Sequence, residues 1–120
     1  FLDGNLRAGV EIILDFVELR TKINGANLVI TGEGGMDFQT VYNKAPIGVA
    51  RLASDMSIPC FGISGMLGEH YPVVHEHGLQ SALSIVSGPM TLEEASSNVS
   101  ELIENSVEEA LRLIRIGMSL

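Results

Sequence analysis

Two carboxylates and a lysine stand close together in the segment 27–46 of this 120-residue chain. Glu33 and Asp37 follow a short apolar run, and Lys44 comes just before a proline that suits the first turn of a helix. Carboxylates can hold Mg²⁺ or accept a proton from a substrate hydroxyl, and a lysine can neutralise a phosphate. Because phosphoryl transfer requires these groups, we interpret the segment as a candidate catalytic loop.

The same segment contains a glycine-rich turn with Gly32, Gly34 and Gly35. Backbone N–H groups of such a turn can approach an anion closely, and a helix N-terminus adds positive potential there. The spacing matches neither familiar nucleotide motif, since Asp37 replaces the third glycine of the dinucleotide fingerprint and Lys44 lacks the following Ser or Thr of a P-loop. Taken alone, the spacing fits a plain strand-to-helix loop with solvated charges equally well.

The rest of the chain alternates helical periodicity with short apolar runs. Apolar strands that alternate with helices are typical of an α/β protein, in which helices on both faces cover a parallel, Rossmann-like sheet. Right-handed crossovers would bring the loops after all strands to one edge of that sheet. The pattern predicts a helix over 6–22, a strand over 27–31, a helix over 46–56, a strand over 60–64, a short helix over 70–77, a strand over 82–86 and a capped helix over 91–116.

A second loop of the same kind follows the second predicted strand. Ser64 and Gly65 begin this loop, and at the common sheet edge they would lie near the glycine-rich turn. A serine there can bind a substrate, although serine is also common in turns. Three strands are few for such a sheet, and its outer strands need cover. We therefore expect the unit 1–120 to belong to a larger domain or to self-associate.

Composition narrows the function classes. A net charge of −8 argues against nucleic acid and anionic membrane partners, and 46% apolar with 18% charged residues is typical of a globular protein. No apolar run is long enough for a membrane span and no secretion signal is recognisable, so a cytoplasmic protein is expected. Cys60 is predicted to be a buried thiol. We interpret His70, His75 and His77 as surface or packing residues rather than metal ligands.

A longer set of residues extends the pattern of the glycine-rich turn. It comprises 28–34, Asp37, Gln39–Thr40, 44–50, and further positions at 8–12, 58–59, 64–68, 77–78 and 91–95. Together these residues resemble the signature of the bacterial glycerate kinase family, the type that is not a P-loop enzyme. The likeness spans nearly the whole chain.

The resemblance implies the C-terminal third of a two-domain α/β enzyme whose active site lies between the domains. It also implies ATP- and Mg²⁺-dependent phosphorylation of D-glycerate, with the remaining N-terminal part of the enzyme as the partner of this chain. Our catalytic candidates are Asp37, Glu33 and Lys44, the first two also as Mg²⁺ ligands; our binding candidates are Gly32, Gly34, Gln39, Thr40, Ser64 and Gly65.

The chain departs from the family pattern at two positions. Gly35 stands where the family has an arginine, and Asn43 stands where it has a glycine. The missing guanidinium could have bound a carboxylate or phosphate in bidentate fashion, which a lysine does not replace. The alternative hypothesis is therefore a non-catalytic α/β fragment or association module with weak nucleotide binding. Under either hypothesis, we expect the isolated chain to have little or no kinase activity.

Overall fold

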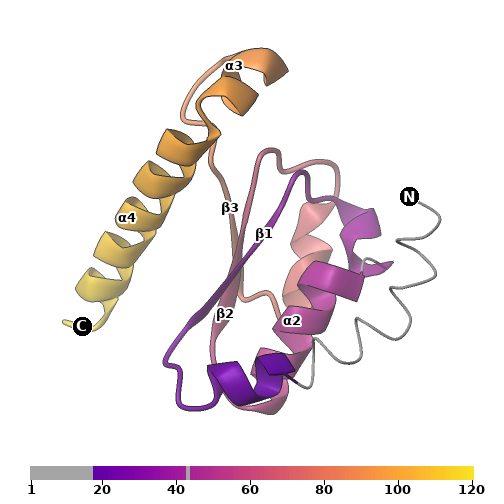
Figure 1. Cartoon of the computed structure of the whole chain (residues 1–120), viewed down its shortest axis with the longest axis vertical. Coiled ribbons are helices and arrows are strands. Elements are labelled where there is room, and N and C mark those ends of the chain that lie inside the picture. Colours follow the sequence, from indigo (N-terminus) through magenta and orange to yellow (C-terminus); the bar gives the residue numbers. More distant parts are fainter. Residues whose placement is uncertain (1–17, 43) are drawn as a thin grey trace.

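A three-stranded parallel sheet, in the order β1-β2-β3, forms the centre of the computed structural model, which describes residues 18–42 and 44–120 (Figure 1). The strands are β1 (Val29–Glu33), β2 (Cys60–Ser64) and β3 (Ser81–Ser84). Residues 18–23 are helical, and the later helices are η1 (Phe38–Tyr42), α2 (Lys44–Asp55), η2 (Tyr71–His77), α3 (Leu92–Ser97) and α4 (Val99–Gly117). The predicted α/β fold with a parallel sheet is confirmed.

The strand boundaries differ from the prediction at both outer strands. Residues 60–64 are a strand as expected, but β1 begins at Val29 and runs to Glu33, so the first part of the predicted glycine turn is extended. The cause is main-chain pairing, since Gly32 and Glu33 continue the parallel register with β2. β3 likewise lies one to two residues before its predicted range 82–86.

The helices also differ in detail. α2 begins at Lys44, two residues before its predicted start, and η2 over the predicted helix 70–77 is a 3₁₀ helix. The prediction of one helix over 91–116 is wrong, because the helix is interrupted at Asn98 and divides into α3 and α4. At the interruption, the Asn98 side-chain amide donates to the Glu94 carbonyl at 2.8 Å. The part of the predicted helix 6–22 before residue 18 lies outside the described residues.

One face of the sheet carries the hydrophobic core, and we call it the core face. Val29 and Cys60 point to this face, where α2 packs with its small side chains Ala50 and Ala53, both fully buried. Cys60 is buried as predicted, and burial raises the pKa of its thiol to about 11. The complete cluster comprises Ile23, Val29, Met36, Ile47, Ala50, Ala53, Ile58, Cys60, Val74 and Leu79.

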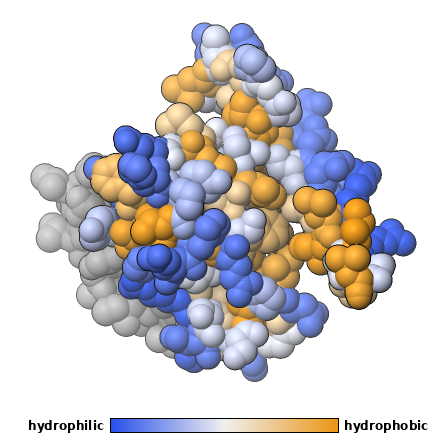
Figure 2. All heavy atoms as spheres, turned by 180° about the vertical axis from the view of Figure 1, so that it is seen from behind, coloured by the Kyte–Doolittle hydropathy of each residue, from blue (hydrophilic) through white to orange (hydrophobic). Residues whose placement is uncertain are grey.

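The opposite face, which we call the open face, lies under α4 and is packed much less densely. On α4 only Leu102 and Ala110 are buried. Hollows of about 430, 260 and 140 Å³ separate the helix from the strands. Figure 2 shows apolar atoms gathered at the C-terminal end of α4, where Leu113 and Ile116 are 64% and 61% exposed. Helices flank both faces as predicted, but only the core face is closed.

None of the helices in the described part of the chain is both long and apolar enough to cross a membrane.

Candidate functional site

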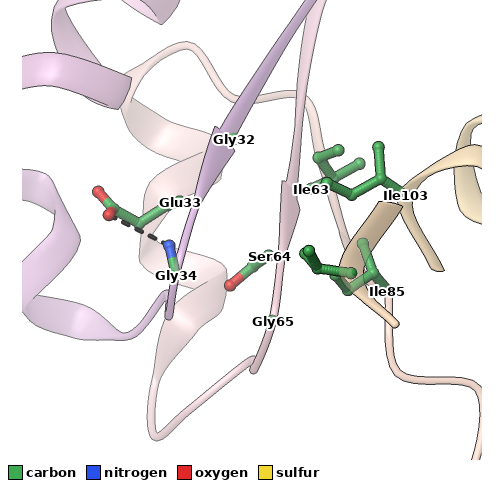
Figure 3. A pocket seen from close by; sticks show the side chains of 9 residues that line it. Gly32, Glu33, Gly34, Ile63, Ser64, Gly65, Ile85 and Ile103 are labelled. Carbon is green, nitrogen blue, oxygen red and sulfur yellow. Dashed lines mark hydrogen bonds between the residues drawn. The ribbon is translucent and has the colours of Figure 1, made fainter. Parts of the chain in front are cut away.

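A cavity of about 430 Å³ opens at the carboxyl ends of the strands, which is where open α/β sheets bind ligands (Figure 3). One side is formed by the ends of β1 and β2 and the residues just after them. The other side is apolar and comes from the chain after β3 and from the first turns of α4. The lining residues are Gly32, Glu33, Gly34, Ile63, Ser64, Gly65, Ile85, Val99 and Ile103.

The cavity brings together residues that were predicted from two separate loops. Gly32, Glu33 and Gly34 come from the end of β1, and Ser64 and Gly65 come from the end of β2. Parallel pairing places Glu33 directly beside Ser64. The expectation that the loops after all strands lie at one edge of the sheet therefore accounts for the proximity of these two residues.

The Glu33 carboxylate is hydrogen-bonded to a main-chain N–H of the glycine turn. Its Oε1 accepts a hydrogen bond from the Gly34 N–H at 3.2 Å, and its side chain points away from Ile63 and Ile103 (Figure 3). An anion that approached the Gly34 N–H would have to displace this carboxylate. The turn, as arranged, therefore suits a cation or a hydroxyl group, and a phosphate only together with a cation.

Asp37, Gln39 and Thr40 lie in the next turn and do not line the cavity. Asp37 Oδ1 accepts from the Gln39 N–H at 2.8 Å, and the Asp37 N–H donates to Thr40 Oγ1 at 3.0 Å. Thr40 is buried and its N–H donates back to the Asp37 carbonyl at 3.1 Å. This reciprocal arrangement starts η1 and fixes the orientation of the Asp37 side chain.

The loop after β2 is bonded to the loop after β1. The Met36 N–H donates to the Met66 carbonyl at 2.8 Å, and the Gly68 N–H donates to the Met36 carbonyl at 2.6 Å. Met36 and Leu67 form a parallel bridge, and the Phe38 N–H donates to the Glu69 carbonyl at 3.1 Å. The pairing of β1 with β2 thus resumes beyond the sheet, and the position of Asp37 depends on the second loop.

Close approach of the two loops requires glycine at position 65 and leaves little room for a side chain at position 68. A Cβ at Gly65 would stand 2.7 Å from the Gly34 carbonyl oxygen, and one at Gly68 would stand 3.2 Å from Asp37 Cβ. Ser64 is also committed to the loop, since its hydroxyl donates to the Met66 carbonyl at 2.7 Å and accepts from the Met66 N–H at 3.2 Å. The contact of Ser64 with a substrate stays a prediction.

The pattern that defines the glycerate kinase family matches residues 1–115 of this sequence. The chain belongs to that family. It is similar to the glycerate kinase of Bacillus cereus, with 44% identity over 116 residues that make up 97% of this chain and 30% of the relative. The glycerate 2-kinase of Escherichia coli K12 is 36% identical over 118 residues, which cover 98% of this chain and 31% of that protein.

A solved structure supports the same family assignment. The crystal structure of a candidate glycerate kinase 2 from Salmonella typhimurium LT2 matches with a TM-score of 0.66 at 36% identity, over 93% of this chain and 28% of that one. The chain thus spans about 30% of the length of the glycerate kinases it matches. This fraction agrees with the predicted assignment to a part of a larger enzyme.

The described site includes neither the Lys44 side chain, a predicted site residue, nor the three histidines, which were interpreted as surface or packing residues. Lys44 begins α2, but its side chain lies outside the described part of the chain. Within residues 18–42 and 44–120, no three His, Cys, Asp or Glu side chains gather as a metal site. The histidines have other partners: His70 pairs with Glu69 at 3.3 Å, His75 bonds the Leu79 carbonyl at 2.8 Å and His77 bonds Arg51 at 3.0 Å.

Sequence reasoning missed the apolar wall of the cavity. Val99 and Ile103 lie one helical turn apart on the apolar stripe of α4, and Ile85 follows β3 at the common sheet edge. Their pattern was visible in the sequence. The sequence predicted the helix and the strand that carry these residues, but nothing in it showed that α4 would stand away from the sheet.

Proposed function

We propose that this chain is part of a glycerate kinase that transfers the γ-phosphoryl group of ATP to D-glycerate. The observation that carries the proposal is the carboxylate-bearing turn at the carboxyl end of β1, beside a ligand-sized cavity, in a chain of the glycerate kinase family. Most of the enzyme's length lies outside the matched segment, and we assign the other wall of the active site to it.

In the proposed reaction, a glycerate hydroxyl attacks the γ-phosphorus of ATP. A new P–O bond forms, the bond to the β-phosphate oxygen breaks, ADP leaves, and a carboxylate takes the hydroxyl proton. Asp37 and Glu33 are both candidates for the base. We prefer Asp37 because its residue is fixed at two points: its Oδ1 accepts a 2.8 Å hydrogen bond from the Gln39 N–H, and its main-chain N–H donates to Thr40 Oγ1 at 3.0 Å.

The proposed reaction also requires Mg²⁺, and the carboxylates of this segment are ligands of the kind that this ion prefers. Magnesium in kinases is typically held by one or two carboxylates, with substrate phosphates and waters as the other ligands. Glu33 and Asp37 supply two carboxylates four residues apart, and each accepts a hydrogen bond from a backbone amide of its own turn, Gly34 for Glu33 and Gln39 for Asp37. When bound, the ion would neutralise phosphate charge that the carboxylates of this turn would otherwise repel. We assign Lys44 to a phosphate or to the glycerate carboxylate.

The assignment is tested in the full-length enzyme with a coupled assay for ADP production. We expect Asp37→Asn to lower kcat/KM for D-glycerate by about 10² to 10⁴, the usual effect of losing a general base. Lys44→Ala should also lower it. Asp55→Asn and Lys22→Ala are the matched controls, since these residues lie away from the cavity and should leave activity unchanged. If Asp37→Asn and Lys44→Ala both leave kcat/KM unchanged, the site assignment is wrong.

The roles of the two carboxylates are separated by a magnesium titration. A residue that holds the ion should, when changed to its amide, raise the Mg²⁺ concentration needed for half-maximal activity. A residue that acts as the base should instead lower kcat at saturating Mg²⁺. We expect Glu33→Gln to show the first behaviour and Asp37→Asn the second. The isolated chain should show no glycerate-dependent ATP hydrolysis, and turnover by it would favour a self-sufficient site.

A further inference from the structure

β1 has a free edge in the part of the chain that the structure describes, where it pairs with β2 alone. The Val29 N–H donates to the Pro59 carbonyl at 2.9 Å, and the Glu33 carbonyl accepts from the Gly65 N–H at 3.4 Å. In a parallel pair, alternate residues bond to the same neighbour. The main-chain groups of Ile30 and Gly32 therefore point away from β2, toward the free edge.

The first three residues of β1 have the composition of an interior strand. Val29, Ile30 and Thr31 are all β-branched, and the strand has no lysine or proline, the residues that commonly protect an edge from pairing. Ile30 is 38% exposed on the open face, whereas its neighbour Val29 is 9% exposed on the core face. An apolar residue left uncovered, beside main-chain groups that no strand in the described residues pairs with, indicates a missing neighbour.

The handedness of the crossovers indicates what that neighbour is. The connections from β1 to β2 and from β2 to β3 both run over the core face, through α2 and η2, and both move the chain in the same direction across the sheet (Figure 1). The helical residues 18–23 also pack on the core face, because Ile23 belongs to the same cluster as Val29 and Ala50. A right-handed crossover over the core face always moves in that direction. A parallel strand before this helix would thus lie on the far side of β1 from β2, at the free edge.

We infer that the polypeptide preceding this chain supplies a parallel strand that pairs with Ile30 and Gly32 of β1. The relatives have the length needed for it, since this chain spans only 30% of the Bacillus cereus enzyme. The inference rests on family membership and topology and not on the proposed catalysis. Its consequence for the site is direct: the turn at 32–37 becomes interior to the sheet, so a loop from the added strand flanks it on the side opposite Ser64 and Gly65.

Residue-resolved hydrogen exchange on the full-length enzyme tests the inference. The amides of Val29 and Thr31 face β2 and serve as internal controls for a paired strand. We expect the amides of Ile30 and Gly32 to be slowed as strongly as these controls, by about a thousandfold or more relative to an unstructured peptide. Near-unstructured exchange at Ile30 and Gly32, with Val29 and Thr31 protected, would overturn the inference.

The identity of the neighbour is decided by two further measurements. Protection that disappears when the enzyme is diluted to a monomer, as followed by light scattering, would assign the edge to a second copy and contradict the inference. A photo-crosslinking amino acid in place of Ile30 should join the monomer to the polypeptide that precedes this chain. Crosslinks between copies, or only to residues 1–120, would equally contradict it.

Discussion

The two faces of the sheet differ in how they are closed. The core face is covered by α2, η2 and the helical residues 18–23, which immediately precede or connect the strands, and its cluster members are at most 9% exposed. Among residues 18–42 and 44–120, the open face is covered only by α4, which follows the last strand and stands over hollows. Segments that neighbour the strands in sequence are therefore enough to close the core face. On the open face, α4 leaves hollows above the strands.

The largest expected difference between the faces is in how much a Leu→Ala substitution lowers the free energy of unfolding. Leu79 is fully buried on the core face, so Leu79→Ala should lower the free energy of unfolding by about 2 to 5 kcal/mol. Leu113 on α4 is 64% exposed, so Leu113→Ala should change it by less than about 0.5 kcal/mol in the isolated chain. Urea unfolding of both variants measures the comparison. Equal effects would mean that the faces are packed alike.

A glycine on the core face should also be much less replaceable than one outside it. Gly78 has a φ of 101°, and a Cβ there would stand 2.9 Å from the Ala50 carbonyl oxygen of α2. We expect Gly78→Ala to lower the free energy of unfolding by about 2 to 3 kcal/mol, because strain and overlap act together. Gly88 is the control, since a Cβ there meets nothing within 4 Å. A neutral Gly78→Ala would show that α2 can move away from the sheet at little cost.

The buried thiol of the core face should make stability depend on pH. Burial raises the pKa of Cys60 from 9.0 to about 11, so the unfolded chain releases its thiol proton at lower pH than the folded chain does. The free energy of unfolding should therefore fall as pH rises from about 9 to about 11, by about 2 kcal/mol at most. Urea unfolding at pH 8 and pH 11 measures the fall. Cys60→Ala should reduce it, and an unchanged fall in that variant would place the alkaline sensitivity elsewhere.

The smallest effect is expected on the outer surface of α4. Arg112 pairs with Glu108 and Glu109 within the same helix, and its side chain is 59% exposed. Exposed pairs of this kind contribute little, so Arg112→Ala should lower the free energy of unfolding by less than about 0.5 kcal/mol. Raising the salt concentration should reduce even this difference. A loss above about 1 kcal/mol would show that Arg112 holds α4 to the rest of the molecule.

The sequence predicted those features that depend on local pattern. Residues 60–64 formed the expected strand, Cys60 was buried, and Thr91 capped its helix by accepting from the Glu94 N–H at 3.1 Å. The break at Asn98 and the extension of β1 to Glu33 were missed. Both depend on a specific hydrogen bond or strand register, and helical or strand periodicity does not encode these.

The candidate site was predictable to a similar degree. Parallel topology alone was enough to bring the ends of β1 and β2 together, which accounts for Glu33 and Ser64 meeting in one cavity. The dependence of the position of Asp37 on the second loop was not predictable. It arises from the bridge between Met36 and Leu67, which are far apart in sequence. The apolar wall required knowledge of where α4 lies, which a stripe of apolar residues does not supply.

The bonded loops after β1 and β2 also determine how this site can be exchanged between related kinases. Three main-chain bonds join Met36 and Phe38 to Met66, Gly68 and Glu69, and no side chain of either loop takes part in them. In a chimera that replaced residues 34–38 alone, the unchanged second loop would still require its hydrogen-bond partners at the same spacing. A first loop of a different length could not make these bonds. The two loops therefore form one structural unit. They should be exchanged between enzymes together, and a change in the length of one requires a matching change in the other.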